Sequence, residues 1–237
     1  MEDVKLETPS SPGDLFMATG VGDVALVAHR PLFTGDIFTL DGASMVALVQ
    51  HPCALRSGVS LSPRLLTCAV VEPATAIRSD WMNEPYSRMA VKALTNAPLV
   101  IDFSEMDMIE SDTLLRSDRI AIMSQRGVNL LLQRWVHFNA RVVIPTGTYQ
   151  AQSSGPFEEA DLILEALDEL TASGLDAAAA LVLIDAWFGQ ALDGTMKSHR
   201  ETLREPQDRA VVRTALRRQV ASWIDAPPAP GAATAAR

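Results

Sequence analysis

The chain contains little cysteine and few aromatic residues, and its apolar runs are short. Cys53 and Cys68 are the two cysteines in 237 residues, and Trp, Tyr and Phe together make up 5%. Secreted domains of this size seldom depend on one disulfide, so the cysteine content favours a reducing, cytoplasmic location. A membrane helix needs about 18 uncharged apolar residues, and the best run, 180–188, is interrupted by Asp185. The first residues, MEDVKLETPSSPGD, lack the basic and apolar regions of a signal peptide.

Positive charge is also scarce. The 20 Lys and Arg residues are outnumbered by 29 Asp and Glu, which gives a formal net charge of −9. Phosphate binding depends on clustered basic side chains that displace counterions, so we expect no direct binding to nucleic acid. An acidic chain of this kind is suited to a protein partner.

The common motifs of enzyme and cofactor sites are missing from the sequence. There is no P-loop, no G-x-G-x-x-G after a strand and no G-x-S-x-G. No C-x-x-C or H-x-x-x-H pair suggests a metal site. We therefore expect neither a cofactor nor a bound metal, and the sequence favours a protein that is not an enzyme.

Alternating and valine-rich segments predict an antiparallel sheet in the first part of the chain. Residues 35–40 and 44–50 flank Asp41-Gly42, a dipeptide typical of tight hairpins because both residues accept positive φ. Further strands are expected at 64–73, at 98–106 and, ending at Pro145, within 140–149.

Helical patterns dominate the rest. Ser124 is expected to cap an amphipathic helix near 124–139, and Asp176 to cap a buried helix that follows. Gly174 should end a helix that starts at 157 after the break QSSGP, and Pro206 should open the last helix. The sequence thus predicts an α+β fold, a small SH3-like antiparallel barrel or sheet with a helical C-terminal part. The expected parts are a flexible leader (1–19), a β-rich domain (20–150), a helical part (156–224) and a disordered tail (225–237).

One apolar strand ends in a group of reactive side chains, VALVQHPCALRSG. His51, Cys53 and Arg56, here called the strand-end cluster, follow directly on that strand. His51 and Cys53 would share a face if the segment stays extended, as a thiol nucleophile and its base would require. Together with Cys68 they would supply three of the four ligands of a zinc ion. A structural role is the third reading, because free cysteine often serves as a small buried hydrophobe.

Arginines recur along the last predicted helix. Arg209, Arg213 and Arg217, here called the arginine row, stand at four-residue steps and would form a ridge for an acidic partner or nucleic acid. The alternative is a solvated face paired with carboxylates. Trp223 follows on the same helix and would anchor a partner if it is exposed.

Residues 35–79 resemble the opening of the MazF/PemK-like endoribonuclease toxins. The matching parts are Gly35-Asp36-Ile37, Ala47-Leu48-Val49 and Pro73-Ala74-Thr75. The resemblance implies an SH3-like barrel and a catalytic role for Thr75. The arginine that this family carries before its second strand is replaced by Gly42-Ala43-Ser44-Met45, so Arg56 or Arg78 would have to stabilise the developing charge.

A second resemblance is to proteins of phages and mobile elements. It rests on the segment Gln50–Leu55, with the pattern Q-x-x-C-x-L, and on the helix from Met123 to Arg134. Among acidic phage proteins of this size, the chain is similar to the recombination directionality factors of serine integrases. That similarity implies a non-enzymatic regulatory protein whose partner is a serine integrase.

Overall fold

The computed structural model describes the greater part of the chain and divides it into two compact units. Unit 1 comprises residues 1–28 and 32–153, and unit 2 comprises 29–31 and 154–237. Within them, the residues whose structure is described are 5–20, 30–42, 44–57, 60–73, 86–91, 94, 97–114, 118–192 and 194–226. Thr75, Arg78 and the predicted tail from residue 227 lie outside the described residues.

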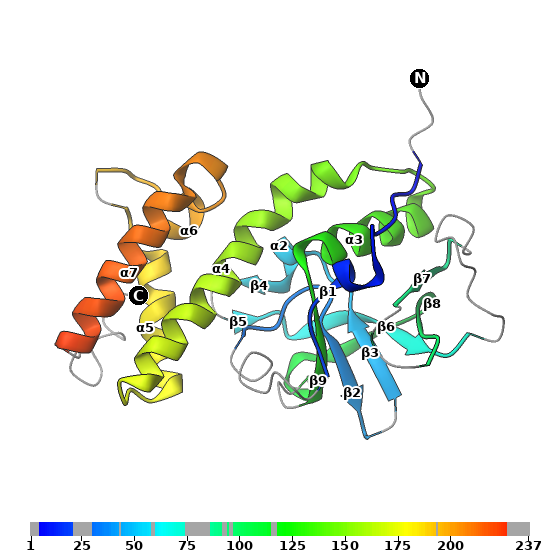
Figure 1. Cartoon of the computed structure of the whole chain (residues 1–237), viewed down its shortest axis with the longest axis horizontal. Helices are drawn as coiled ribbons and strands as arrows, with labels where there is room; N and C mark the ends of the chain where they lie inside the picture. The colour runs from blue at the N-terminus through cyan, green and yellow to red at the C-terminus, as the bar shows by residue number, and fades with distance from the viewer. Residues whose placement is uncertain are drawn as a thin grey trace. The chain divides into compact units, whose positions relative to one another are not determined.

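Unit 1 is built on a seven-stranded antiparallel sheet (Figure 1). The strand order is β1-β9-β2-β3-β6-β8-β7, which leaves β1 and β7 at the two edges. The α+β class, with a sheet followed by a helical part, is therefore confirmed. The strands are β1 (Phe16–Thr19), β2 (Ile37–Leu40), β3 (Ser44–Leu48), β6 (Arg64–Val71), β7 (Arg88–Ala90), β8 (Val100–Glu110) and β9 (Arg119–Met123), with a separate small pair, β4 (Arg56–Ser57) and β5 (Ser60–Leu61).

The hairpin between β2 and β3 forms where the sequence predicts it. Asp41 and Gly42 adopt positive φ values of 49° and 72°, and Leu40 pairs with Ser44 across the turn. A short polar side chain and a glycine tolerate this backbone, whereas most residues do not. The turn fixes the register of the two strands.

Gly35 and Asp36 have structural reasons to precede β2. Gly35 has a φ of 89°, and a Cβ there would lie 2.8 Å from the Cβ of Met123. The Asp36 carboxylate accepts a hydrogen bond from the Phe33 amide and pairs with Arg119 at 2.8 Å, with both side chains fully buried. These contacts tie the start of β2 to β9.

Residues 5–19, which the sequence assigned to a flexible leader, include defined elements of unit 1, and residues 1–4 lie outside the described residues. A short 3-10 turn, η1 (Pro12–Leu15), leads into β1, which pairs with β9, and Leu15 is fully buried. Helix α3 (Gln125–Ala140) packs close to η1. It is capped as predicted by Ser124, whose hydroxyl accepts a hydrogen bond from the Gly127 amide. A Cβ at Gly127 would lie 2.2 Å from the Leu15 carbonyl oxygen, so this glycine permits the close approach.

Helix α4 (Thr146–Ala172) overturns two predictions. Residues 142–145 form no strand, and the helix begins at Thr146, whose amide donates to the Glu7 carboxylate at 2.7 Å. The predicted break QSSGP lies inside the helix, because buried contacts outweigh the amide hydrogen bond that Pro156 forgoes. Ser153, fully buried, bonds Asn129 at 2.7 Å, for example.

The end of α4 agrees with the sequence. Gly174 has a φ of 97°, and the amides of Leu175 and Gly174 donate to the carbonyls of Leu170 and Thr171, each at 3.0 Å. This pattern of two bonds closes a helix around a left-handed residue. The chain can therefore turn directly into α5.

Unit 2 is helical and has its own apolar core. Asp176 caps α5 as predicted, accepting hydrogen bonds from Ala178 and Ala179. Only one face of α5 is buried, however; Val182 on the opposite face is 52% exposed, because α5 has neighbours on one side and solvent on the other. The helices are α5 (Ala177–Gly189), α6 (His199–Thr202) and α7 (Arg209–Asp225), the last preceded by the 3-10 turn η6 (Pro206–Asp208).

Two short elements of unit 1 complete the described structure, α2 (Pro52–Leu55) and the 3-10 turn η4 (Ser111–Thr113). None of the described helices is both long enough and apolar enough to cross a bilayer.

Candidate functional site

His51 in the strand-end cluster serves as a helix cap. Its Nδ1 accepts a hydrogen bond from the Cys53 amide at 3.2 Å, at the start of α2. Burial lowers the pKa of this imidazole, and a hydrogen bond with Gln152 opposes that shift. The chain is not extended here, so the shared face expected for His51 and Cys53 is replaced by a helical turn that starts at Pro52.

The two thiols have opposite environments. Cys53 is exposed on α2, whereas Cys68 is fully buried on β6. Burial, and then the nearby charge of Asp102, raise the pKa of the Cys68 thiol to about 12. A thiol with this pKa is protonated at neutral pH, so Cys68 lacks the thiolate that nucleophilic, redox and metal chemistry need.

Arg56 is directed at the protein backbone. Its guanidinium donates to the Leu32 carbonyl oxygen, which ties β4 to the segment before β2. Thr75 and Arg78, the other residues of the endoribonuclease hypothesis, lie outside the described residues, so their geometry with Arg56 is not defined. Over the described part of the chain, no group of three or more His, Cys, Asp or Glu is arranged to hold a metal ion.

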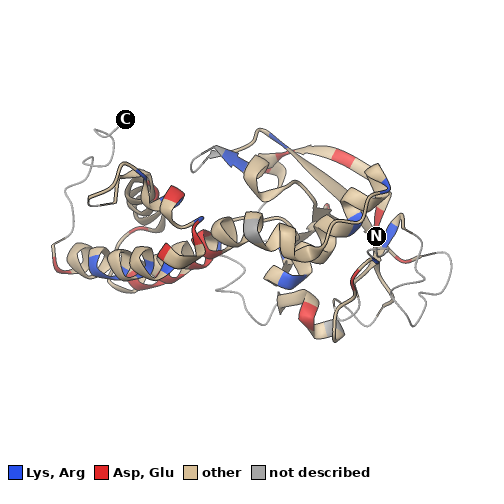
Figure 2. Ribbon diagram, turned by 90° about the horizontal axis from the view of Figure 1, so that it is seen from above, with Lys and Arg blue, Asp and Glu red and all other residues tan. Residues whose placement is uncertain are grey.

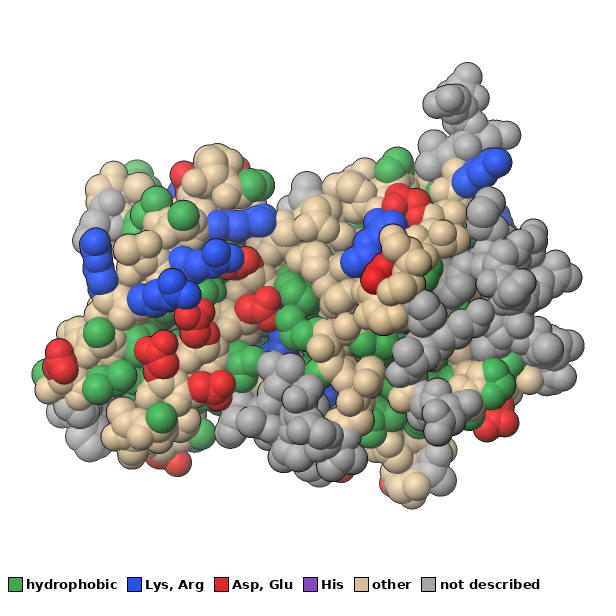
Figure 3. All heavy atoms as spheres, viewed as in Figure 1, with side chains coloured by type: hydrophobic (Ala, Val, Ile, Leu, Met, Phe, Trp, Pro, Cys, Tyr) green, Lys and Arg blue, Asp and Glu red, His purple; other side chains and the backbone are tan. Residues whose placement is uncertain are grey.

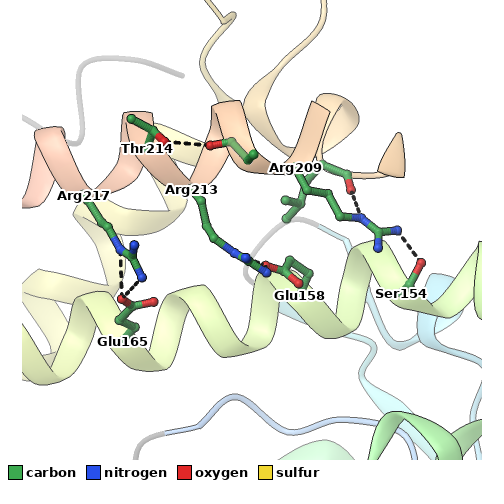
Figure 4. A network of polar contacts seen from close by, with 9 residues as sticks. Ser154, Glu158, Glu165, Arg209, Arg213, Thr214 and Arg217 are labelled. Carbon is green, nitrogen blue, oxygen red and sulfur yellow. Dashed lines mark hydrogen bonds and ion pairs between the residues drawn. The ribbon is translucent and has the colours of Figure 1, made fainter. Parts of the chain in front are cut away.

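The arginine row lies against α4 within unit 2 (Figure 4). Arg213 bonds Glu158 through two of its nitrogens, and Arg217 bonds Glu165 at 3.1 and 2.7 Å. Arg209 donates to the Ser154 hydroxyl and to the Leu203 carbonyl. Arg213 and Arg217 therefore have the carboxylate-paired arrangement that the sequence also allowed, whereas Arg209 is bonded to a hydroxyl and a main-chain carbonyl.

The surface of unit 2 shows the same pairing. Figure 2 shows Lys and Arg interspersed with Asp and Glu along its helices. On the face seen in Figure 3, a row of basic side chains lies beside acidic ones. Arg213 and Arg217 keep 46% and 63% of their side chains exposed, so they remain accessible while paired. Trp223 is partly buried and packs against the core of the unit.

The predicted strand at 98–106 is present as β8, but the sequence did not predict its continuation to Glu110. Strand β7 pairs with it at residues 100–102 only, and residues 104–110 continue beyond that pairing. Those seven residues, here called the open edge, are exposed except for the half-buried Ile109. Met106 and Met108 each keep 40% of their area exposed. The alternation in SEMDMIE was the available signal, since it follows directly on a buried strand.

The open edge is held in shape from one side. Residues Met106–Glu110 pair with Cys68–Arg64 of β6, and a change of register separates this segment from Asp102. Asp102 accepts hydrogen bonds from the amide and the hydroxyl of Ser104 and lies 3.5 Å from the Arg88 guanidinium. These bonds stabilise the bend that carries β8 past β7.

Comparison with models of protein families and with curated proteins finds no match to this chain.

Proposed function

We propose that the protein is a non-enzymatic regulator that acts by binding another protein. The observation that carries this proposal is the open edge of β8. There two methionines are exposed on a stretch of strand that pairs with β6 on one side. Contiguous apolar side chains on a surface, rimmed by polar residues, mark sites of interaction with proteins, membranes or ligands. An exposed strand edge adds main-chain groups that another chain can pair with.

The strand-end cluster supports the same conclusion. His51 caps α2, Arg56 holds a backbone carbonyl, and Cys68 is buried with a raised pKa. Each of these side chains thus has a structural task that accounts for its position.

A serine integrase is the partner class that we propose to test first, because the size and acidity of the chain resemble those of recombination directionality factors, a resemblance that the comparisons with known proteins do not address. The purified chain would be mixed with a serine integrase encoded in the same genome. We expect the two to co-elute in size-exclusion chromatography and the chain to shift recombination of attachment sites towards excision. An integrase that neither co-elutes nor changes direction would exclude this partner.

The endoribonuclease alternative is tested on the same preparation. Total RNA incubated with the chain should stay intact. Cleavage that disappears in Thr75→Ala, with the fold of the variant verified by circular dichroism, would overturn the proposal of a non-enzymatic regulator.

A further inference from the structure

The main-chain amide and carbonyl of Met108, in the middle of the open edge, point away from the sheet. Leu66 of β6 donates its amide to Gln50 and accepts from the Val49 amide, so both of its polar groups face β3. Leu66 is the partner of Met108 in the register. In an antiparallel pair, residues that face each other either exchange both hydrogen bonds or exchange none. The amide and carbonyl of Met108 therefore face outward.

Side chains of the sheet itself form hydrogen bonds with the outward-facing amide and carbonyl of Met108. The Met108 amide donates to the Asp107 carboxylate at 2.7 Å, and its carbonyl accepts from the Arg64 guanidinium at 3.2 Å. Arg64 is 58% exposed, and Asp107 lies on the surface. Exposed side-chain contacts of this kind contribute little stability, so an incoming strand can replace them.

The two faces of the open edge differ in chemistry. Successive side chains of a strand point to opposite faces, so Met106, Met108 and Glu110 share one face of the regularly paired segment, and Asp107 and Ile109 share the other. Glu105 lies in the irregular stretch just before this segment. A strand laid along this edge would therefore meet the two exposed methionines on one side and the exposed Asp107 carboxylate on the other, while Glu110, on the methionine side, is paired with Arg64. Cross-strand pairs favour opposite charges and penalise like charges.

This distribution of charge favours some partner strands over others at the open edge. A second copy of the chain would bring its own Glu105 and Asp107 to the same edge, and both copies carry a net charge of −9. A segment with basic side chains on one face and apolar ones on the other meets neither penalty. Charge complementarity thus favours a basic partner over self-association.

We propose that the open edge of β8 takes up an extended segment of the partner protein, in which apolar residues alternate with Lys or Arg, as an additional strand. This inference rests on the proposed function, since it names the surface and the chemistry by which the partner docks.

The first test uses a fluorescently labelled seven-residue peptide in which Val alternates with Lys, and full-length protein. We expect saturable binding by fluorescence anisotropy. A peptide of the same composition with its Val and Lys residues in two blocks should bind at least about tenfold more weakly, because it cannot match both faces. Equal binding of the two peptides would contradict the proposal.

Two variants locate the binding. Asp107→Lys should weaken binding of the basic peptide about tenfold and favour an alternating Val/Glu peptide, whereas Glu72→Lys, the same charge change at an exposed position after β6, should leave binding within about twofold. Met108→Pro removes an amide that faces outward and so spares the pairing with β6. It should abolish binding while circular dichroism stays unchanged. Unaltered binding in both variants would overturn the proposal.

The same variants separate this inference from the proposed function. If the integrase binds wild type and Met108→Pro equally well, the regulator function stands and the open edge is not its docking surface. If the integrase binds neither, the partner assignment fails whatever the peptides do.

Discussion

At the scale of single residues, the two cysteines show how position decides reactivity. Cys53 lies on the surface at the start of α2, and Cys68 lies inside the sheet beside Asp102. A thiol reacts through its thiolate and only where a reagent can reach it. From the sequence alone, Cys53 was a candidate nucleophile or zinc ligand and Cys68 a further zinc ligand, because neither burial nor the neighbouring carboxylate can be read from the segments around them.

This contrast predicts the outcome of a thiol titration. With a chromogenic disulfide reagent at pH 8, the native protein should release one equivalent per chain promptly and the second only after unfolding in guanidinium. Cys53→Ser should remove the prompt equivalent, and Cys68→Ala should remove the delayed one. Prompt release of two equivalents by the folded protein would show that Cys68 is accessible.

At the scale of elements, local signals predicted caps and turns well. Ser124, Asp176 and Gly174 end or begin helices where expected, because each acts on amides or carbonyls within a few residues of itself. The predicted strand at 140–149 and the predicted break at QSSGP were wrong because α4 depends on partners far away in the sequence. Glu7, whose carboxylate accepts a hydrogen bond from the Thr146 amide, lies 139 residues away from Thr146 in the sequence.

In the candidate site, too, the local features could be predicted from the sequence and the distant contacts could not. The sequence identified the strand end that carries His51, Cys53 and Arg56, but their tasks depend on local helix formation at Pro52 and on the distant Leu32 carbonyl. The open edge was missed because β8 is recognised as an edge only once the short extent of β7 is known.

The close approach of η1 to α3 makes Gly127 a test of element packing. Gly127→Ala should lower the free energy of unfolding by about 1–3 kcal/mol, because its Cβ would meet the Leu15 carbonyl oxygen at 2.2 Å and the backbone must shift. Gly147→Ala is the matched control. It lies in the first turn of α4 with nothing within 4 Å of the new Cβ, so it should leave stability unchanged or raise it by up to about 1 kcal/mol. Urea denaturation monitored by circular dichroism measures both, and equal effects would refute the packing argument.

Glu7 connects the N-terminal segment to α3 and α4, and its ionisation should be visible in the pH dependence of stability. Burial acts to raise its pKa, but hydrogen bonds from Thr146 and the nearby Arg126 outweigh burial and hold the pKa below its usual 4.5. A carboxyl whose pKa is lower in the folded state stabilises the protein above the unfolded pKa. That contribution is lost as the pH falls through the folded pKa.

The difference in unfolding free energy between wild type and Glu7→Gln should therefore be constant near neutral pH and shrink below about pH 4.5. Urea denaturation at a series of pH values measures it. Glu72→Gln, which changes an exposed carboxyl after β6, should follow the wild-type curve throughout. A Glu7→Gln difference that persists undiminished at pH 3 would show that the carboxylate charge is not what holds the segment.

At the scale of the whole molecule, the chain order and the division into units do not coincide. Residues 29–31 belong to unit 2 although they precede most of the sheet in sequence. Arg30 is fully buried, bonds Asp161 of α4 at 2.9 Å, and lies 4.7 Å from the centre of the Phe157 ring. Composition and periodicity mark the helical part from residue 156 onward, but they carry no sign that an arginine more than a hundred residues earlier completes it.

This arginine should matter more to unit 2 than any member of the arginine row. Arg30→Met should destabilise the unit by about 2 kcal/mol, because removing one partner of a buried pair leaves the other poorly solvated. The loss is no larger because the Asp161 side chain is 39% exposed and water solvates part of its charge. Arg217→Met breaks a pair with the same helix, but its arginine is 63% exposed and the expected loss is under about 1 kcal/mol.

Hydrogen exchange followed by mass spectrometry measures these losses within unit 2 separately from unit 1. Peptides covering 157–172 and 177–189 should exchange faster in Arg30→Met than in Arg217→Met, while peptides covering β3 and β6 stay unchanged in both. The comparison holds the partner helix, the charge removed and the new side chain constant, while the two arginines differ in burial and in the contact of Arg30 with the Phe157 ring. Equal acceleration in both would mean that Arg30 stabilises α4 no more than a surface ion pair does.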